Sequence, residues 1–140
     1  MADIRAADPR PVTPALLAAF LLFATAMAGL AAVTLLRPGG PLDAAWRIKP
    51  AEYAQLRAMG PWVGAGFAAL SAAAGLLALG VLRRRLWAWR GAVFGLAVNG
   101  LADAIRGLSG SWIEGVLGVT VTGLFVWWLT RPRVRALFRR

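Results

Sequence analysis

The chain is 140 residues long, 59% of them hydrophobic, with a mean hydropathy of +0.64. Soluble domains are nearer to half apolar, so this composition favours a membrane protein. The net charge of +10 would suggest nucleic-acid binding in a soluble protein, but here we assign the basic excess to the flanks of membrane helices. Because the chain has no cysteine and no histidine, disulfides and thiolate or histidine metal sites are excluded. We expect no nucleic-acid partner, no metal and no cofactor.

Four apolar stretches follow one another along the chain. A helix needs about 20 apolar residues to cross the hydrocarbon core of a bilayer. The sequence therefore predicts membrane-spanning helices at 13–36, 62–82, 86–107 and 111–130, followed by a basic tail at 131–140. We interpret residues 1–140 as a single membrane domain, an all-α integral membrane four-helix bundle. The first stretch is longer than the 7–15 apolar residues that are typical of a signal peptide, so we expect it to stay uncleaved.

Glycine and proline mark the ends of these stretches. Pro38-Gly39-Gly40-Pro41 ends the first helix, Gly60-Pro61 precedes the second, and Pro132 stops the fourth. In the 37–61 loop, Pro50 fits the first position of a short helix that places Tyr53, Leu56 and Met59 on roughly one side. We predict an amphipathic helix on the outer leaflet; docking of a partner would use the same residues.

The basic residues predict the topology. Cytoplasmic segments of membrane proteins are enriched in arginine and lysine. An inside location of both termini places most basic residues in the cytoplasm, namely Arg5, Arg10, Arg83, Arg84, Arg85, Arg90, Arg131, Arg133, Arg135, Arg139 and Arg140, and leaves Arg37, Arg47, Lys49 and Arg57 outside. Six of the seven tryptophans fall at the predicted helix ends, as expected for an interfacial belt, and the seventh, Trp46, lies in the outer loop. The near absence of lysine is typical of high-GC bacteria, so we predict the bacterial inner (cytoplasmic) membrane.

Small residues at four-residue spacing predict how the helices pack. Membrane helices associate through close backbone approach and polar contacts. The predicted contact seams, one on each of the last three helices, contain Gly60, Gly64, Ala68 and Ala72, then Gly91, Gly95, Asn99 and Asp103, and finally Glu114, Gly118 and Thr122.

The main candidate site is a polar cluster inside the predicted spans. Asn99, Asp103 and Arg106 lie on one face of the third predicted helix, and Glu114 opens the fourth across a short hairpin. Ionisable residues within membrane helices are functional candidates because their burial in lipid is costly. The structural alternatives are an Asp103–Arg106 ion pair, a capping box in which Ser111 precedes Glu114, and an interhelical contact through Asn99. We assign no catalytic, metal-binding or cofactor-binding residue.

Two further groups of residues are candidates for contacts with lipid or a partner. In the outer loop these are Trp46, Tyr53 and Leu56, and in the tail they are Arg133, Arg135 and Phe138. The tail alternates arginines with an apolar side of Val134, Leu137 and Phe138. We expect anionic lipids to hold it at the cytoplasmic face, although a cytoplasmic partner could use the same surface.

The segment Leu129-Thr130-Arg131-Pro132-Arg133-Val134-Arg135-Ala136-Leu137-Phe138 resembles the closing segment of small four-helix bacterial membrane proteins of unknown function. This resemblance implies a membrane bundle and carries no activity.

Three functions are left open by the sequence. The first, which we favour, is a non-catalytic accessory, assembly or scaffold component of a membrane complex, associated with another membrane protein or with itself. The second is a small oligomeric transporter or channel that uses the polar cluster. The third is a lipid-modifying membrane enzyme, in which Asp103 and Glu114 would perform acid–base chemistry without a histidine.

Overall fold

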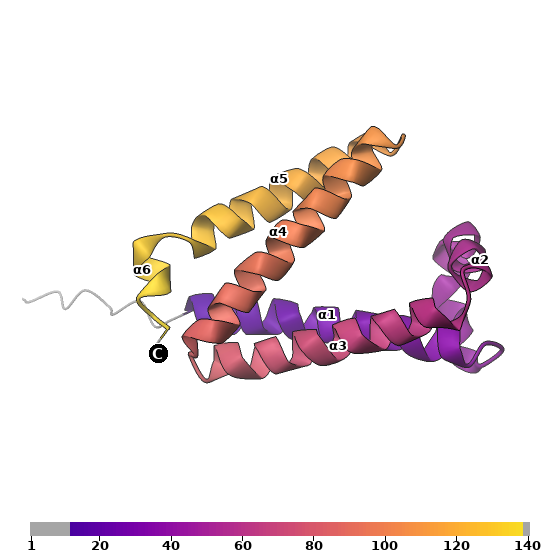
Figure 1. The fold of residues 1–140 in the computed structure, drawn as a ribbon, viewed down its shortest axis with the longest axis horizontal. Helices are drawn as coiled ribbons and strands as arrows, with labels where there is room; N and C mark the ends of the chain where they lie inside the picture. The colour runs from indigo at the N-terminus through magenta and orange to yellow at the C-terminus, as the bar shows by residue number, and fades with distance from the viewer. Residues whose placement is uncertain (1–11, 139–140) are drawn as a thin grey trace, which may run out of the picture. The chain divides into compact units, whose positions relative to one another are not determined.

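The computed structural model describes residues 12–138 and is all-helical, with no strand in that range (Figure 1). The predicted inner flank before the first helix, with Arg5 and Arg10, lies outside the described residues, as do Arg139 and Arg140 of the tail.

The four predicted long helices are present, with ends within one or two residues of those predicted. They are α1 (Val12–Leu36), α3 (Pro61–Leu82), α4 (Leu86–Leu108) and α5 (Trp112–Leu129). Three segments are long and apolar enough to cross a membrane: Thr13–Leu36, Pro61–Leu82 and Trp112–Leu129. Helix α4 has 23 residues but is less apolar, because it contains Arg90, Asn99, Asp103 and Arg106.

The chain divides into two compact units. One comprises Ala19–Ala78, which includes most of α1 and α3 and the segment between them. The other comprises α1 up to Ala18 and the chain from Leu79 onward, which contains α4 and α5.

Within the unit Ala19–Ala78, α1 and α3 pack through small and hydroxylated residues. The Ser71 hydroxyl donates a hydrogen bond to the Thr25 carbonyl at 2.8 Å. A Cβ on Gly29 would lie 3.2 Å from the Ser71 Oγ, and one on Gly64 would meet the Leu36 side chain at 2.8 Å. Gly64 thus lies in the contact, close to the Leu36 side chain. The rest of the predicted seam does not, because Ala68 and Ala72 are exposed and a Cβ on Gly60 would meet nothing within 4 Å.

The segment between α1 and α3 contains two short helices instead of the single one predicted. They are the 3-10 helix η1 (Pro41–Ile48) and α2 (Pro50–Ala58), and we call them together the cap. Each begins with a proline, whose fixed φ and missing N–H suit the first helical position. Gly60 ends α2 with φ of +95°, a conformation that L side chains rarely adopt.

In the other unit, α4 and α5 run side by side, joined by a short turn at Gly110 (Figure 1). Their backbones come close together at Gly107 and Gly115, where a Cβ on Gly115 would meet the backbone of α4. One turn further along α5, a Cβ on Gly118 would meet the Asp103 side chain, and a Cβ on Gly100 would lie 3.0 Å from Thr122.

The seam on α4 differs from the predicted one. A Cβ on Gly95 would meet nothing within 4 Å, and Asn99 is exposed, so the predicted run through these residues faces away from α5. Asp103 belongs both to the predicted seam and to the surface of α4 that contacts α5. The other residues of that contact surface are Gly100 and Gly107, which the prediction did not include. Glycine and alanine recur on more than one side of α4, and the residues facing α5 are selected by Gly115 and Gly118 on that helix.

The tail folds back on α4 and α5 rather than extending from them. Its short helix α6 (Pro132–Arg135) is followed by Phe138, and both Val134 and Phe138 are buried. The Arg135 guanidinium carbon lies 5.7 Å from the centre of the Trp89 ring, and that of Arg131 lies 3.9 Å from the Trp127 ring. Arg133 is exposed. The apolar side of the tail is therefore buried against other residues of the same chain, and the arginines of the tail that the structure describes are exposed.

Candidate functional site

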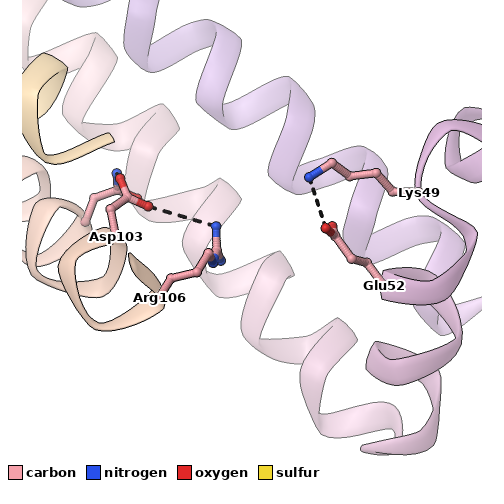
Figure 2. Close-up of polar contacts among 5 residues, drawn as sticks. Lys49, Glu52, Asp103 and Arg106 are labelled. Carbon is pink, nitrogen blue, oxygen red and sulfur yellow. Dashed lines mark hydrogen bonds and ion pairs between the residues drawn. The ribbon is translucent and has the colours of Figure 1, made fainter. Parts of the chain in front are cut away.

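Three of the four predicted cluster residues lie together on α4. The Asn99 side-chain amide donates a hydrogen bond to Asp103 Oδ2 at 3.2 Å. On the other side, Arg106 Nη1 lies 3.9 Å from Asp103 Oδ1, as Figure 2 shows. The spacing of three and four residues along a helix brings these side chains onto one face. Asp103 is therefore held from both sides by residues of its own helix.

The Asp103 carboxylate lies at the contact between α4 and α5. Its side chain is 19% exposed, whereas that of Arg106 is 64% exposed. Gly118 on α5 makes room for the carboxylate, because any side chain there would collide with it. The acidic group is thus enclosed by the helix pair, and the two polar residues beside it point outward.

Glu114 is placed apart from this group. It is exposed in the first turn of α5, and no hydrogen bond or ion pair joins it to the other three residues in the described part of the chain. The Ser111 side chain makes no cap hydrogen bond, so the serine half of the predicted capping box is absent. A carboxylate at this position still complements the positive end of the helix dipole.

The outer-loop candidates Trp46 and Tyr53 are anchored to the end of α1. The Trp46 indole N–H donates to the Thr34 Oγ1 at 2.8 Å. The Tyr53 hydroxyl, which has a single proton, lies within hydrogen-bond distance of both Asp43 Oδ2, at 3.0 Å, and the Thr34 carbonyl, at 3.2 Å. The two rings stack with centres 5.1 Å apart. Leu56 is half-buried on the same short helix. Much of this aromatic surface is therefore used inside the chain.

Thr34 and Asp43 hold the cap together and were not singled out from the sequence. Thr34 is 1% exposed, and its hydroxyl also bonds to carbonyls of α1. Asp43 Oδ2 accepts the Gly39 N–H at 2.7 Å and lies 3.0 Å from the Tyr53 hydroxyl. The signal available was a lone hydroxyl near the end of an apolar stretch, followed by an aspartate just beyond the glycine pair.

Because Tyr53 is the single tyrosine, its titration reports directly on the cap. Burial raises the pKa of Tyr53 above its ordinary value of 10.0, and Asp43 raises it further by hydrogen bonding and by its charge, while Arg57 opposes them. The protonated phenol thus stabilises the cap at pH values below 10 and loses this effect as the pH rises through the higher folded-state pKa. We expect the phenolate absorbance to appear with a midpoint above 10, and Asp43→Asn to move that midpoint downward. A midpoint unchanged by Asp43→Asn would contradict the contact.

No three acidic side chains in residues 12–138 gather in a way that could hold a metal ion. Neither a protein-family model, nor a curated protein sequence, nor a solved structure matches this chain.

Proposed function

We propose that the chain crosses the bacterial inner membrane four times, with both termini in the cytoplasm. What supports a crossing by α4 is its length of 23 residues, about 35 Å at 1.5 Å per residue, against a hydrocarbon core of about 30 Å. Its neighbour α5 is an apolar candidate span packed along it. Exposed tryptophans at helix ends, Trp62, Trp87, Trp112 and Trp127, suit the two interfacial belts.

Within that membrane we propose that the protein is a non-catalytic accessory component that assembles with another membrane protein through one face of α4. The observation that supports this is a row of small and polar positions, Gly95, Asn99, Ala102 and Arg106, which we call the α4 polar face. All four are exposed and follow one another at helical spacing.

The physical reason lies in the solvent. In lipid, an exposed amide such as that of Asn99 finds no hydrogen-bond partner beyond its own chain, and an exposed glycine offers a place for close backbone approach. The hydrogen bond to Asp103 uses one of the two N–H donors of the Asn99 amide. The side-chain carbonyl oxygen of Asn99 is an acceptor, and the Asp103 carboxylate offers it no donor. A second helix that covers the face would satisfy the amide and fill the space beside Gly95.

The occupant we infer is a transmembrane helix of a different protein, with a polar side chain at the depth of Asn99 and an acidic one near Arg106. Arg106 is 64% exposed, and its contact with Asp103 is long, so an acidic group on a partner would add a charge-assisted bond. A second copy of this chain would bring another guanidinium to the same face, which is less favourable.

The natural absence of cysteine makes this proposal directly testable. A benzophenone maleimide attached to Gly95→Cys is expected to cross-link the protein in native membranes to a distinct partner with one-to-one stoichiometry. The matched control is Gly123→Cys on α5, which also has nothing within 4 Å and is expected to give no such product.

Replacement of the amide is expected to weaken the complex. Polar contacts between membrane helices contribute about 1–2 kcal/mol, so Asn99→Leu should reduce recovery of the partner in mild detergent about tenfold, whereas Phe94→Leu, also on exposed α4 surface, should not. A product of two copies of this chain, a product within one chain, or equal cross-linking from positions 95 and 123 would each contradict the proposal.

A small oligomeric transporter is the second candidate, and the Asp103 carboxylate with its outward-facing neighbours Asn99 and Arg106 supports it. In that case Asp103→Asn, which keeps the shape of the side chain, would abolish ion flux in reconstituted vesicles while the protein still inserts. Unaltered flux, or none in the unmodified protein, would contradict this second function.

A further inference from the structure

An apolar groove of about 490 Å³ lies in the unit Ala19–Ala78, where α1, α3 and the cap meet. Its floor is made by alanines of α1, and larger apolar residues, Met27, Phe67 and Leu70, form its walls. Ala28 and Ala31 are 7% and 8% exposed, whereas Met27 and Leu70 are more than half exposed. Small residues between protruding ones leave a channel, and its volume is in the range of small-ligand sites.

The cap forms a fixed roof over one end of this groove. Ala45 and Trp46 of η1 line it. The Trp46 ring cannot swing freely, because its indole N–H is bonded to Thr34 and Tyr53 stacks on it at an interplanar angle of 19°. The groove is therefore formed before any ligand arrives, which lowers the entropic cost of binding.

The roofed end of the groove is basic. Lys49 is the one charged residue among those that line it, and its side chain is 51% exposed beside Glu52, 3.0 Å away (Figure 2). In the 37–61 segment as a whole, Arg37, Arg47, Lys49 and Arg57 outnumber the two acidic residues, Asp43 and Glu52. One of those two, Asp43, is already engaged with Gly39 and Tyr53. The groove thus runs from an apolar region on two candidate membrane spans to a cationic end outside them.

We propose that this groove binds one acyl chain of an anionic phospholipid, with the phosphate at Lys49 and Arg47. The apolar lining of the groove matches the acyl chain of such a lipid, and the cationic end matches its phosphate. An acyl chain also suits the groove better than a helix of a partner, because a helix with its side chains is about 10 Å wide and an acyl chain is much thinner. The Lys49 ammonium, which contacts Glu52, lies among the residues that line the groove, and its positive charge would attract the phosphate. This site uses none of the residues of the α4 polar face.

The test measures lipid retention by native mass spectrometry. The purified full chain is titrated in detergent with dioleoyl phosphatidylglycerol or dioleoyl phosphatidylcholine. We expect one phosphatidylglycerol to be retained at least fivefold more strongly than phosphatidylcholine. Ala45→Phe fills the groove from an exposed position and should reduce retention of both lipids about tenfold. Its matched control is Ala44→Phe, the adjacent exposed residue of η1, which does not line the groove and should retain lipid normally.

The charge is tested separately. Lys49→Gln should lower the preference for phosphatidylglycerol about fivefold, because a basic residue near an anionic surface contributes about 1 kcal/mol. Helical circular dichroism verifies that each variant is folded. Three outcomes would overturn the proposal. The Ala45→Phe and Ala44→Phe variants could retain lipid equally, or the protein could show no preference between the two lipids. The third is that Ala45→Phe disrupts a dimer of the chain and leaves lipid retention unchanged.

Discussion

Replacement of Gly115 by valine is expected to destabilise the α4–α5 pair by about 3 kcal/mol, the upper end of the usual cost of overpacking. A Cβ at this position would lie 2.7 Å from the Gly107 nitrogen and 2.9 Å from the Asp103 carbonyl oxygen. Both are backbone atoms, so no side-chain rotation can relieve the collision. The two helices must separate, and their contact further along, at Gly118 and Thr122, is lost with them.

Gly123→Val is the matched control on the same helix. It introduces the same β-branched residue, but a Cβ there meets nothing within 4 Å. We expect its stability to lie within about 0.5 kcal/mol of the unmodified protein, as for a substitution away from packed features. Unfolding in mixed micelles with increasing dodecyl sulfate, followed by circular dichroism, measures both variants. Equal midpoints for the two would show that α4 and α5 are not in close contact at Gly115.

Trp89→Ala is expected to have the second large effect, about 3 kcal/mol of destabilisation, as is usual for truncation of a buried aromatic side chain. Trp89 is 8% exposed, and its indole N–H donates to the Leu129 carbonyl at 3.1 Å. That carbonyl lies in the last turn of α5 and has no helical N–H to accept. Truncation therefore leaves both a cavity and an unpaired backbone acceptor, and it removes the ring beside Arg135.

Trp89→Phe separates these causes. It keeps an aromatic ring and removes the indole donor, so we expect a smaller loss of about 1–2 kcal/mol, the cost of a buried carbonyl without a partner. Trp87→Phe, at an exposed tryptophan of the same helix turn, is the control and should be near neutral. The same micelle unfolding experiment applies. A loss from Trp87→Phe as large as that from Trp89→Phe would contradict the assigned role of the hydrogen bond.

The ends of the helices were predictable because they depend on local chemistry. The stop at Leu36 follows from Pro38 and the glycine pair, and the start of α2 at Pro50 follows from the fixed φ of proline. The η1 helix was missed because its order depends on contacts outside its own sequence. Trp46 holds it to Thr34, twelve residues earlier, and no local pattern in 41–48 reports that bond.

The polar cluster was predictable only in part. The contacts of Asp103 with Asn99 and Arg106 lie within one helix, so spacing along the chain was sufficient to anticipate them. Whether Asp103 or Asn99 faces α5 depends on the partner helix, and sequence periodicity along α4 alone favoured neither. The exposure of Asn99 and the enclosure of Asp103 by Gly118 are therefore results of the tertiary structure.

The amino-acid sequence by itself determined the number of long helices, their limits, and the apolar character of three of them as candidate membrane spans. These properties depend on the composition of consecutive residues and on the glycines and prolines between them. Only the tertiary structure decided which side of α4 meets α5, how the cap closes over α1, and where the groove beside Lys49 lies. Each of these depends on contacts between residues far apart in the chain, where many small-residue seams are available and close packing selects one.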